Sequence, residues 1–235
     1  MLSGINIFDG GCLRIGIAGR HCLGISSLSF TMAHDIASLG RSPLFVCRKD
    51  KFESNFPLFV EAGSNGVISI GDRSWDSVAL SRIQLNYVNS ASSLRRLMAS
   101  LHAYSPVIDA IIIDSFDYLF EGLHDSVYAS GNSISPIDEL VMTLAFIVDA
   151  VDALNITRTQ QQRVIDHPPL FLIINFHSLA KPVVDAVSRA VDRILVLKEC
   201  DQARPGNAVS SSTLTTSGAR GLYTLNGDAI DLQSR

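Results

Sequence analysis

The chain has 235 residues, of which 47% are hydrophobic and 18% are charged, and its formal net charge at pH 7 is −4. This length and composition predict a globular protein with a substantial core and exclude a largely disordered chain. The negative net charge argues against a protein that holds DNA through a general basic surface, while it leaves room for a local basic patch.

The cysteines and the apolar runs bear on the compartment. The cysteines, at positions 12, 22, 47 and 200, form no close pair, so neither a zinc ribbon nor a disulfide framework is indicated. No signal-peptide pattern is visible, and the longest apolar runs, such as LVMTLAFIV at 140–148, are shorter than a bilayer span. We therefore expect a cytosolic or nuclear protein in a reducing compartment, with no membrane partner.

Short apolar runs alternate with helical patterns along the chain, which predicts an α/β fold with a mainly parallel sheet. Strands are expected, in chain order, at 13–18, 44–47, 66–70, 83–87, 108–116, 170–176 and 193–199, with a terminal hairpin at 221–232. Helices are expected at about 25–40, 94–104 and 136–154, and again after residue 178. We expect residues 1–235 to form one domain, with a core at about 12–200 and then a polar loop and terminal hairpin at 201–235.

Several helix boundaries carry specific signals. The first helix has Leu39 on its apolar face, and Gly40 is a suitable stop. Ser135, which is followed by Pro136, is the expected N-cap of the long helix. Ser178 is the expected cap of the helix after the strand at 170–176.

The turn between the first strand and the first helix has the length of a phosphate-binding loop. That loop requires G-x-x-x-x-G-K-[ST], and here Gly19, Gly24 and Ser26 match while Ile25 replaces the lysine. The glycines would let backbone N–H groups curl around phosphate oxygens, and Ser26 would hold a magnesium ion. An aliphatic side chain cannot bridge two phosphates, so a plain glycine turn for close strand–helix packing is an equal alternative at this point.

A second element favours a nucleotide-binding ancestry. The apolar strand that contains AIIID ends in Asp114, and an acid at the end of such a strand is the magnesium partner of phosphate loops. A strand that ends in Asp is common by itself. Its place after the glycine loop in an alternating chain makes the pair informative.

With both motifs in place, the chain resembles the RecA-like ATPase core of recombinases and their paralogues. The segments LFVCRKDKF, RIQLNYVNSASSLRRLMASLHA and IIIDSFDYLFEG, around residues 44–120, resemble the SWIM-protein-associated subunit of the Shu complex. This resemblance implies a nuclear role in recombination and DNA repair. It implies binding to a zinc-containing SWIM-domain partner and to a recombinase or recombinase paralogues, with single-stranded DNA met as part of a complex.

The resemblance also implies which catalytic parts are missing. Active relatives carry a glutamate just after the second strand, and Lys49 stands at that position here. A lysine does not serve as a general base near neutral pH without a strong perturbation. The polar sensor at the end of the strand at 170–176 corresponds to Phe176, with the polar Asn175 beside it. Gly19, Gly24, Ser26 and Asp114 would therefore form a degenerate site that binds ATP and Mg²⁺ at most weakly.

One further pattern concerns partners. Recombinases join one another through a Phe and an Ala three positions apart, and Phe59 and Ala62 have this spacing. The alternative is that Phe59 is a plain loop anchor in the core. Phe30 and Ala33 share the spacing but lie inside a helix, where core burial is the expected fate.

Three functional hypotheses follow from these patterns. The first is a non-catalytic RecA-like mediator subunit that binds a SWIM-domain partner and helps a recombinase filament form on single-stranded DNA. The second is a working P-loop NTPase or small-molecule kinase with an atypical loop. The third is a structural α/β subunit with no role in recombination.

Overall fold

The computed structural model describes residues 13–19, 24–62, 67–70, 74–103, 108–120, 135–161, 169–199, 212–218, 221–226 and 229–233. The described strands are β1 (Arg14–Gly19), β2 (Pro43–Cys47), β3 (Val60–Ala62), β4 (Val67–Ile70), β5 (Gln84–Tyr87), β6 (Ala110–Ile113), β7 (Phe171–Phe176), β8 (Arg193–Glu199), β9 (Ser212–Gly218), β10 (Gly221–Asn226) and β11 (Ala229–Gln233). The helices are α1 (Ile25–Ser38), α2 (Lys49–Ser54), α3 (Ser77–Leu80), α4 (Ala91–Ser100), α5 (Pro136–Gln161) and α6 (Lys181–Ala190), with 3-10 turns η1 (Leu101–Ala103) and η2 (Phe116–Leu119).

The central sheet is parallel over six strands, in the order β8-β1-β7-β6-β2-β5. Strands β9, β10 and β11 extend it in antiparallel fashion beyond β8, and β4 pairs with both β3 and β9. Strand β7 therefore lies between β1, which leads into the glycine loop, and β6, which leads into Asp114. In an open parallel sheet, ligands bind at the carboxyl ends of the strands, so this arrangement gathers the candidate residues at one edge.

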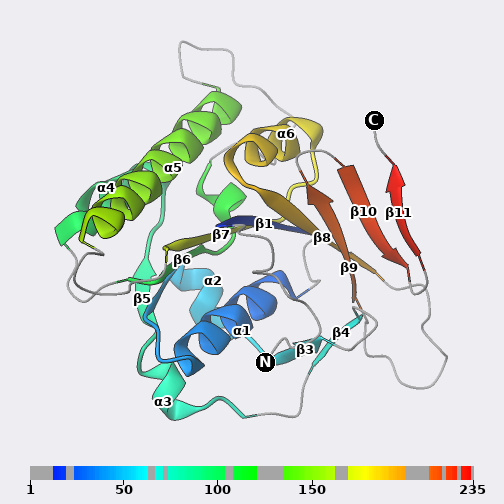
Figure 1. The fold of residues 1–235 in the computed structure, drawn as a ribbon, viewed down its shortest axis with the longest axis horizontal. Helices are drawn as coiled ribbons and strands as arrows, with labels where there is room; N and C mark the ends of the chain where they lie inside the picture. The colour runs from blue at the N-terminus through cyan, green and yellow to red at the C-terminus, as the bar shows by residue number, and fades with distance from the viewer. Residues whose placement is uncertain are drawn as a thin grey trace.

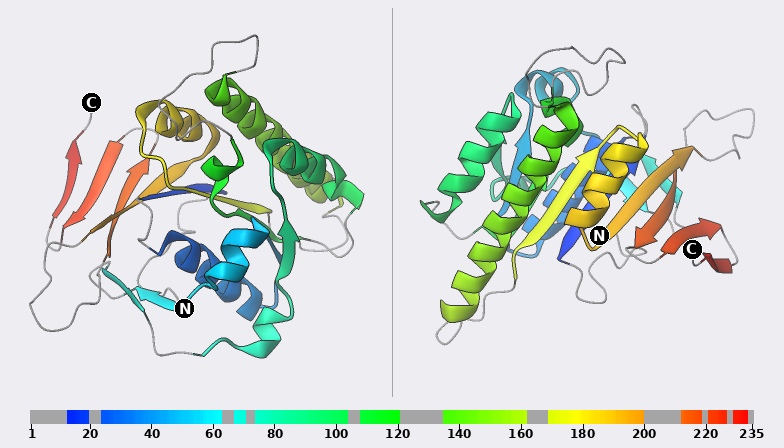
Figure 2. Two further views of the ribbon diagram at one scale, coloured as in Figure 1. Left: turned by 180° about the vertical axis from the view of Figure 1, so that it is seen from behind. Right: turned by 90° about the horizontal axis from the view of Figure 1, so that it is seen from above.

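Helices cover both faces of the sheet. Figure 1 shows α4, α5 and α6 on one side and α1, α2 and α3 on the other, and the view from behind in Figure 2 agrees. Each side has its own buried cluster. One joins the sheet to α4, α5 and α6, and the other joins it to α1 and an aromatic group centred on Phe30. The predicted fold class is confirmed by this topology: an α/β RecA-like core with a mainly parallel sheet, flanking helices and antiparallel C-terminal strands.

Most of the predicted elements are found, and the differences have physical reasons. Leu39 is 64% exposed, because α1 ends at Ser38 before that side chain reaches the core. Ala180 is the N-cap residue of α6 instead of Ser178, whose Oγ accepts a hydrogen bond from the Ala180 N–H at 3.3 Å. Ser135 does accept a hydrogen bond from the Ile137 N–H, as its expected capping role requires.

Helix α2 and strand β3 were not predicted from the sequence, and three further segments also hold more regular structure than it indicated. Helix α5 continues to Gln161, where tertiary contacts hold its last turns: Asn155 accepts from the Leu170 N–H at 2.8 Å, and Arg158 donates to the Ile108 carbonyl. The short helix α3 lies between the predicted strands β4 and β5. Residues 212–218, within the expected polar loop, form β9, which pairs along β8.

Candidate functional site

The two glycines of the predicted phosphate loop occupy places that favour glycine, one through close packing and the other through its backbone conformation. A Cβ on Gly19 would lie 3.0 Å from both Ile25 Cδ1 and Leu197 Cβ. Gly24, directly before α1, has a φ of 71°, in the left-handed region that glycine favours. Residues 20–23, the middle of the loop, lie outside the described residues. The strand–helix junction itself therefore favours glycine at both positions, with or without a phosphate.

Ile25 turns its side chain into the core. It is the first residue of α1, is 1% exposed, and belongs to the same buried cluster as Ile17 and Leu28. Its Cδ1 lies against Gly19, so it fills the space between the end of β1 and the start of α1. The position that a phosphate-loop lysine would occupy is thus a packed aliphatic position.

Ser26 and Asp114 lie together, although 88 positions separate them in the sequence. Ser26 is the second residue of α1, Asp114 directly follows β6, and the Ser26 Oγ donates a hydrogen bond to Asp114 Oδ2 at 3.1 Å. A hydroxyl beside a carboxylate is an all-oxygen donor pair of the kind that magnesium prefers. The structure therefore places these two predicted residues at one site.

Asn175 completes a buried polar network around Asp114. Its Nδ2 donates to Asp114 Oδ1 and also to Ser29 Oγ at 2.8 Å, and its Oδ1 accepts from the Ser115 N–H. Ser115 has a φ of 54°, which is uncommon outside glycine and tends to occur at functional sites. The Ser115 Oγ also lies 3.1 Å from His177 Nε2. Asn175, Ser115 and His177 were not singled out as site residues from the sequence.

The electrostatics of this network follow from burial. Asp114 is 4% exposed, and the loss of hydration raises the pKa of its carboxyl group. Hydrogen bonds from Asn175, Ser26 and Ser115 oppose that rise, and the charge of Asp117 adds to it. Burial, with the charge of Asp114, likewise raises the pKa of the Cys47 thiol to about 12. Cys47 is therefore a structural thiol, not a reactive one.

A cavity of about 520 Å³ adjoins the network. Its lining joins the start of α1, helix α2 with the following segment 55–58, and residues that come after β6 and β7. Among the described residues that line the cavity, Lys51 is the one lysine or arginine. Its Nζ lies 4.7 Å from the centroid of the Tyr118 ring, and that ring lies 5.4 Å from the ring of His177. The lining therefore combines the Lys51 charge and polar groups with apolar side chains such as Phe52 and Phe56.

Lys49 has a different position from Lys51. It is the first residue of α2, its side chain is 61% exposed, and its Nζ lies 3.9 Å from Glu53. It is not among the residues that line the cavity. The neighbouring Asp50 pairs with Arg48 at 2.8 Å, because the chain turns into α2 at this point and does not continue as a strand.

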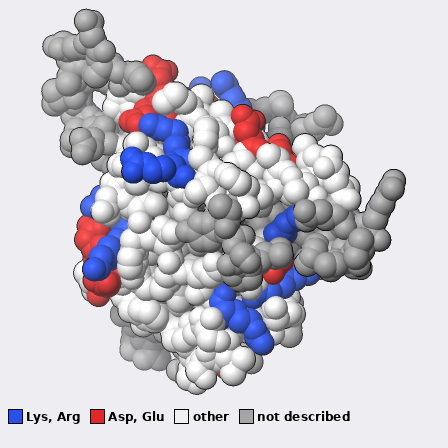
Figure 3. All heavy atoms as spheres, turned by 90° about the vertical axis from the view of Figure 1, so that its left-hand side faces the viewer, with Lys and Arg blue, Asp and Glu red and all other residues white. Residues whose placement is uncertain are grey.

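Arg95, one of two adjacent arginines of α4, makes local contacts within its own chain. Arg95 pairs with Glu139 at 3.3 Å and donates to Thr143 Oγ1 at 2.7 Å. Figure 3 shows blue and red side chains scattered over one face, with wide uncharged areas between them in the part that the structure describes. On that face, the described charges suit local ion pairs better than a continuous nucleic-acid track.

Phe59 is buried in its own chain. It is 7% exposed, and its ring lies 4.9 Å from that of Trp75 and 5.7 Å from that of His34. Ala62, the other member of the predicted docking pair, is the last residue of β3, and its side chain lies outside the described part of the structure. This geometry favours the alternative of a loop anchor, and docking through Phe59 stays a prediction.

Among the residues that the structure describes, those of the site fit the metal side of a nucleotide centre better than the phosphate side. Ser26 and Asp114 could hold Mg²⁺, but the aliphatic side chain of Ile25 has no group that binds a phosphate.

No family model matches the chain, and no curated protein matches it in sequence. A solved structure that it resembles is that of a KaiC-like protein from the hyperthermophilic archaeon Pyrococcus horikoshii OT3. The identity is 12% and the TM-score 0.47, over 98% of this chain and 90% of that chain. Such a likeness bears on neither activity nor partners, so the fold assignment rests on the sheet topology.

Proposed function

We propose that this chain is a RecA-like scaffold subunit that does not turn over ATP and that acts by binding other proteins in homologous recombination. The proposal that the chain does not turn over ATP rests on the burial of Ile25. This side chain is 1% exposed and packs against Gly19, at the position where the phosphate loop requires a lysine. Transition-state charge on a transferring phosphoryl group needs a cation at this place. Lys49, at the position of the catalytic base, is an exposed cation that pairs with Glu53.

The partners in this proposal are a SWIM-domain zinc protein and a recombinase or its paralogues. The support is the resemblance of the segments around residues 44–120, which form β2, α2, β5, α4 and β6 in the structure. In this role the subunit works in the nucleus, and it meets single-stranded DNA only as part of the assembled complex.

Reconstitution tests this proposal. The full chain, co-expressed with the SWIM-domain partner, should raise the rate at which recombinase assembles on single-stranded DNA. Asp114→Ala should raise it to the same extent, because the effect uses protein contacts and not nucleotide chemistry. A chain that forms no complex with the SWIM-domain protein, or a stimulation that Asp114→Ala abolishes, would refute the proposal.

A second candidate is a P-loop NTPase or small-molecule kinase with an atypical loop. The observation that favours it is the contact between Ser26 and Asp114 beside a cavity into which Lys51 brings a positive charge. If Lys51 replaces the missing lysine, Lys51→Ala should lower the affinity for Mg²⁺·ATP in calorimetry by at least about tenfold, as loss of a charged hydrogen bond does. The matched control is Lys49→Ala, which removes the same charge two residues away, outside the cavity lining. Equal affinities of the two variants would rule out this use of Lys51.

A further inference from the structure

Helix α5 is more apolar on its outer side than a surface helix of a globular protein. Its most apolar 18-residue window has a mean hydropathy of 1.7, and 28% of that window is buried. By length and composition alone the helix could span a membrane. Here one stripe of it packs into the core instead, through Leu140, Leu144, Ile147 and Val151. The protein therefore uses α5 as a core helix and still leaves apolar surface beside that stripe.

The exposed apolar surface lies beside the core-facing stripe, on the outer side of the helix. Val141, Met142 and Phe146 remain 46%, 45% and 39% exposed, and Ala145 between them is exposed too. No charged residue occurs between Glu139 and Asp149. A helix that faces water normally carries polar residues there, as α6 does with Asp185 and Arg189. A contiguous apolar surface of this kind marks an interaction site.

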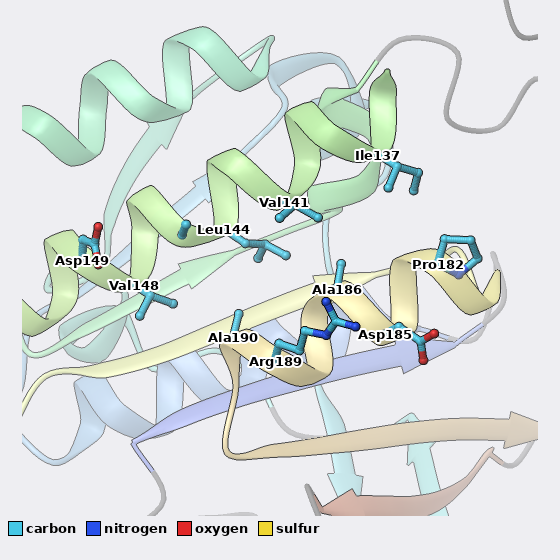
Figure 4. Close-up of a pocket in the computed structure, with 11 residues that line it drawn as sticks. Ile137, Val141, Leu144, Val148, Asp149, Pro182, Asp185, Ala186, Arg189 and Ala190 are labelled. Carbon is cyan, nitrogen blue, oxygen red and sulfur yellow. The ribbon is translucent and has the colours of Figure 1, made fainter. Parts of the chain in front are cut away.

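Part of this surface, Val141 and Ala145, lines a groove between α5 and α6 with a volume of about 460 Å³, whereas Met142 and Phe146 lie outside the groove lining. Figure 4 shows side chains of the two helices facing each other across it, with Val141, Leu144 and Val148 on α5 and Ala186 and Ala190 on α6. The small residues of α6 leave the room that a partner's side chains would fill. From Ile137 to Asp149 the groove is roughly 18 Å long, which suits about three turns of an α-helix.

The charges at the rim identify the chemistry of the occupant. Asp185 lies toward one end of the groove, beside Pro182, and Asp149 toward the other (Figure 4). Arg189 lies between them. In the described part of the chain, no ion pair engages Asp149 or Asp185, whereas Asp152 and Glu139 of α5 are paired with arginines. The rim therefore offers a partner one carboxylate toward each end, with the Arg189 cation between them.

The same charges disfavour a second copy of this chain as the occupant. Helix α5 contains four acidic residues and one basic residue, Arg158. Two copies that packed their α5 helices together would bring acid against acid across an apolar seam, which is unfavourable. An anionic lipid surface meets the same objection.

We propose that the α5–α6 groove docks an amphipathic helix of a different protein, about three turns long, with an apolar stripe and a basic residue toward each end. The apolar stripe fills the space beside Val141 and Ala186, and the basic residues face Asp149 and Asp185. This inference stands apart from the role in recombination, since it needs only the exposed face of α5 and the charges beside it.

The test uses two synthetic helical peptides, each about five turns long, with the same Leu/Ala stripe and with either Lys or Glu at the flanks. Fluorescence anisotropy measures their affinity for the full chain. The lysine peptide should bind at least about fivefold more tightly than the glutamate peptide, the size expected for two partly exposed ion pairs. The double variant Asp149→Lys with Asp185→Lys should reverse this preference.

Two variants of α5 locate the binding. Val141→Glu places a charge in the groove and should weaken binding of the lysine peptide at least tenfold. Ile156→Glu is the matched control, because Ile156 is 59% exposed on the same helix but does not line the groove. Both positions are exposed, so both variants should fold, as thermal melts would check.

Five results would overturn the proposal. The first is that neither peptide binds, and the second is that both bind with equal affinity. The two glutamate variants weaken binding equally. The wild-type chain is a dimer by light scattering that Val141→Glu makes monomeric, so that a second copy is the occupant. Vesicles of neutral or anionic lipid bind the wild type and not Val141→Glu, so that the occupant is a membrane.

Discussion

Replacing Ile25 by lysine would restore the phosphate-loop sequence, and the structure predicts that it lowers stability. Ile25 is 1% exposed and packs with Ile17 and Leu28. Full burial of an isoleucine is worth about 1.5–3 kcal/mol. A lysine stem keeps part of this packing, but its ammonium group must leave the core and reach the cavity that Ile25 also lines.

The expected loss in the free energy of unfolding is about 2–4 kcal/mol, from lost packing and from incomplete hydration of the ammonium group at the cavity. For a chain of this size the melting temperature should fall by roughly 6–12 °C. The matched variant Ile25→Met keeps an apolar chain of similar volume and should cost less than about 1.5 kcal/mol.

Urea denaturation and thermal melts, with and without Mg²⁺·ATP, measure both effects. If Ile25→Lys is as stable as wild type, the assignment of Ile25 to the core is wrong. If Mg²⁺·ATP raises the melting temperature of Ile25→Lys but not that of Ile25→Met, the loop has kept a nucleotide-binding shape and the lysine is its missing part. If it raises neither, the loop does not hold a nucleotide even with its lysine restored.

Two further predictions concern buried groups. Because burial raises the pKa of Asp114, the folded protein holds that proton more tightly than the unfolded chain. The free energy of unfolding should therefore fall as the pH rises from the ordinary aspartate pKa of 3.8 through the raised pKa. Urea titrations of Asp114→Asn should show a smaller fall with pH. An equal fall in the variant and the wild type would contradict this. Phe59→Glu should lower the melting temperature strongly, since Phe59 is 7% exposed, whereas Leu58→Glu, at a 52% exposed neighbour, should not. If Phe59→Glu melts like wild type but loses recombinase in co-precipitation, the docking prediction holds and the anchor interpretation fails.

The fold was largely predictable because its signals are local. Apolar runs such as LFLIINF become buried central strands, and the alternation with helices determines the parallel arrangement. Strand β9 was missed because its Ser- and Thr-rich sequence resembles a loop, although its threonines and Leu214 are compatible with a strand once β8 offers an edge. The length of helix α5 was underestimated, because its polar end is held by contacts with residues outside the helix, Ile108 and Leu170.

The site was predictable only where a motif names its members. Spacing identified Ser26 and Asp114 separately, and the sheet order then brought them to 3.1 Å. The sequence assigned the sensor position to Phe176 and not to Asn175, and this orientation is wrong, because strand alternation gives two faces and does not say which one faces the loop. The structure points Asn175 at Asp114 and buries Phe176 in the opposite cluster, with α5 and α6. Lys51 could not be told from Lys49 by sequence, since only the start of α2 decides which lysine reaches the cavity.

The most direct test of the central claim is a sensitive measurement of ATP hydrolysis by the purified full chain, alone and with the SWIM-domain protein and recombinase that we propose as its partners. The chain lacks a phosphate-loop lysine at Ile25 and a catalytic base at Lys49, so the account predicts that wild type contributes no more turnover than Asp114→Ala in every mixture. Turnover above background that depends on the wild-type chain and is abolished by Asp114→Ala would contradict the account. It would establish the chain as an ATPase with an atypical loop.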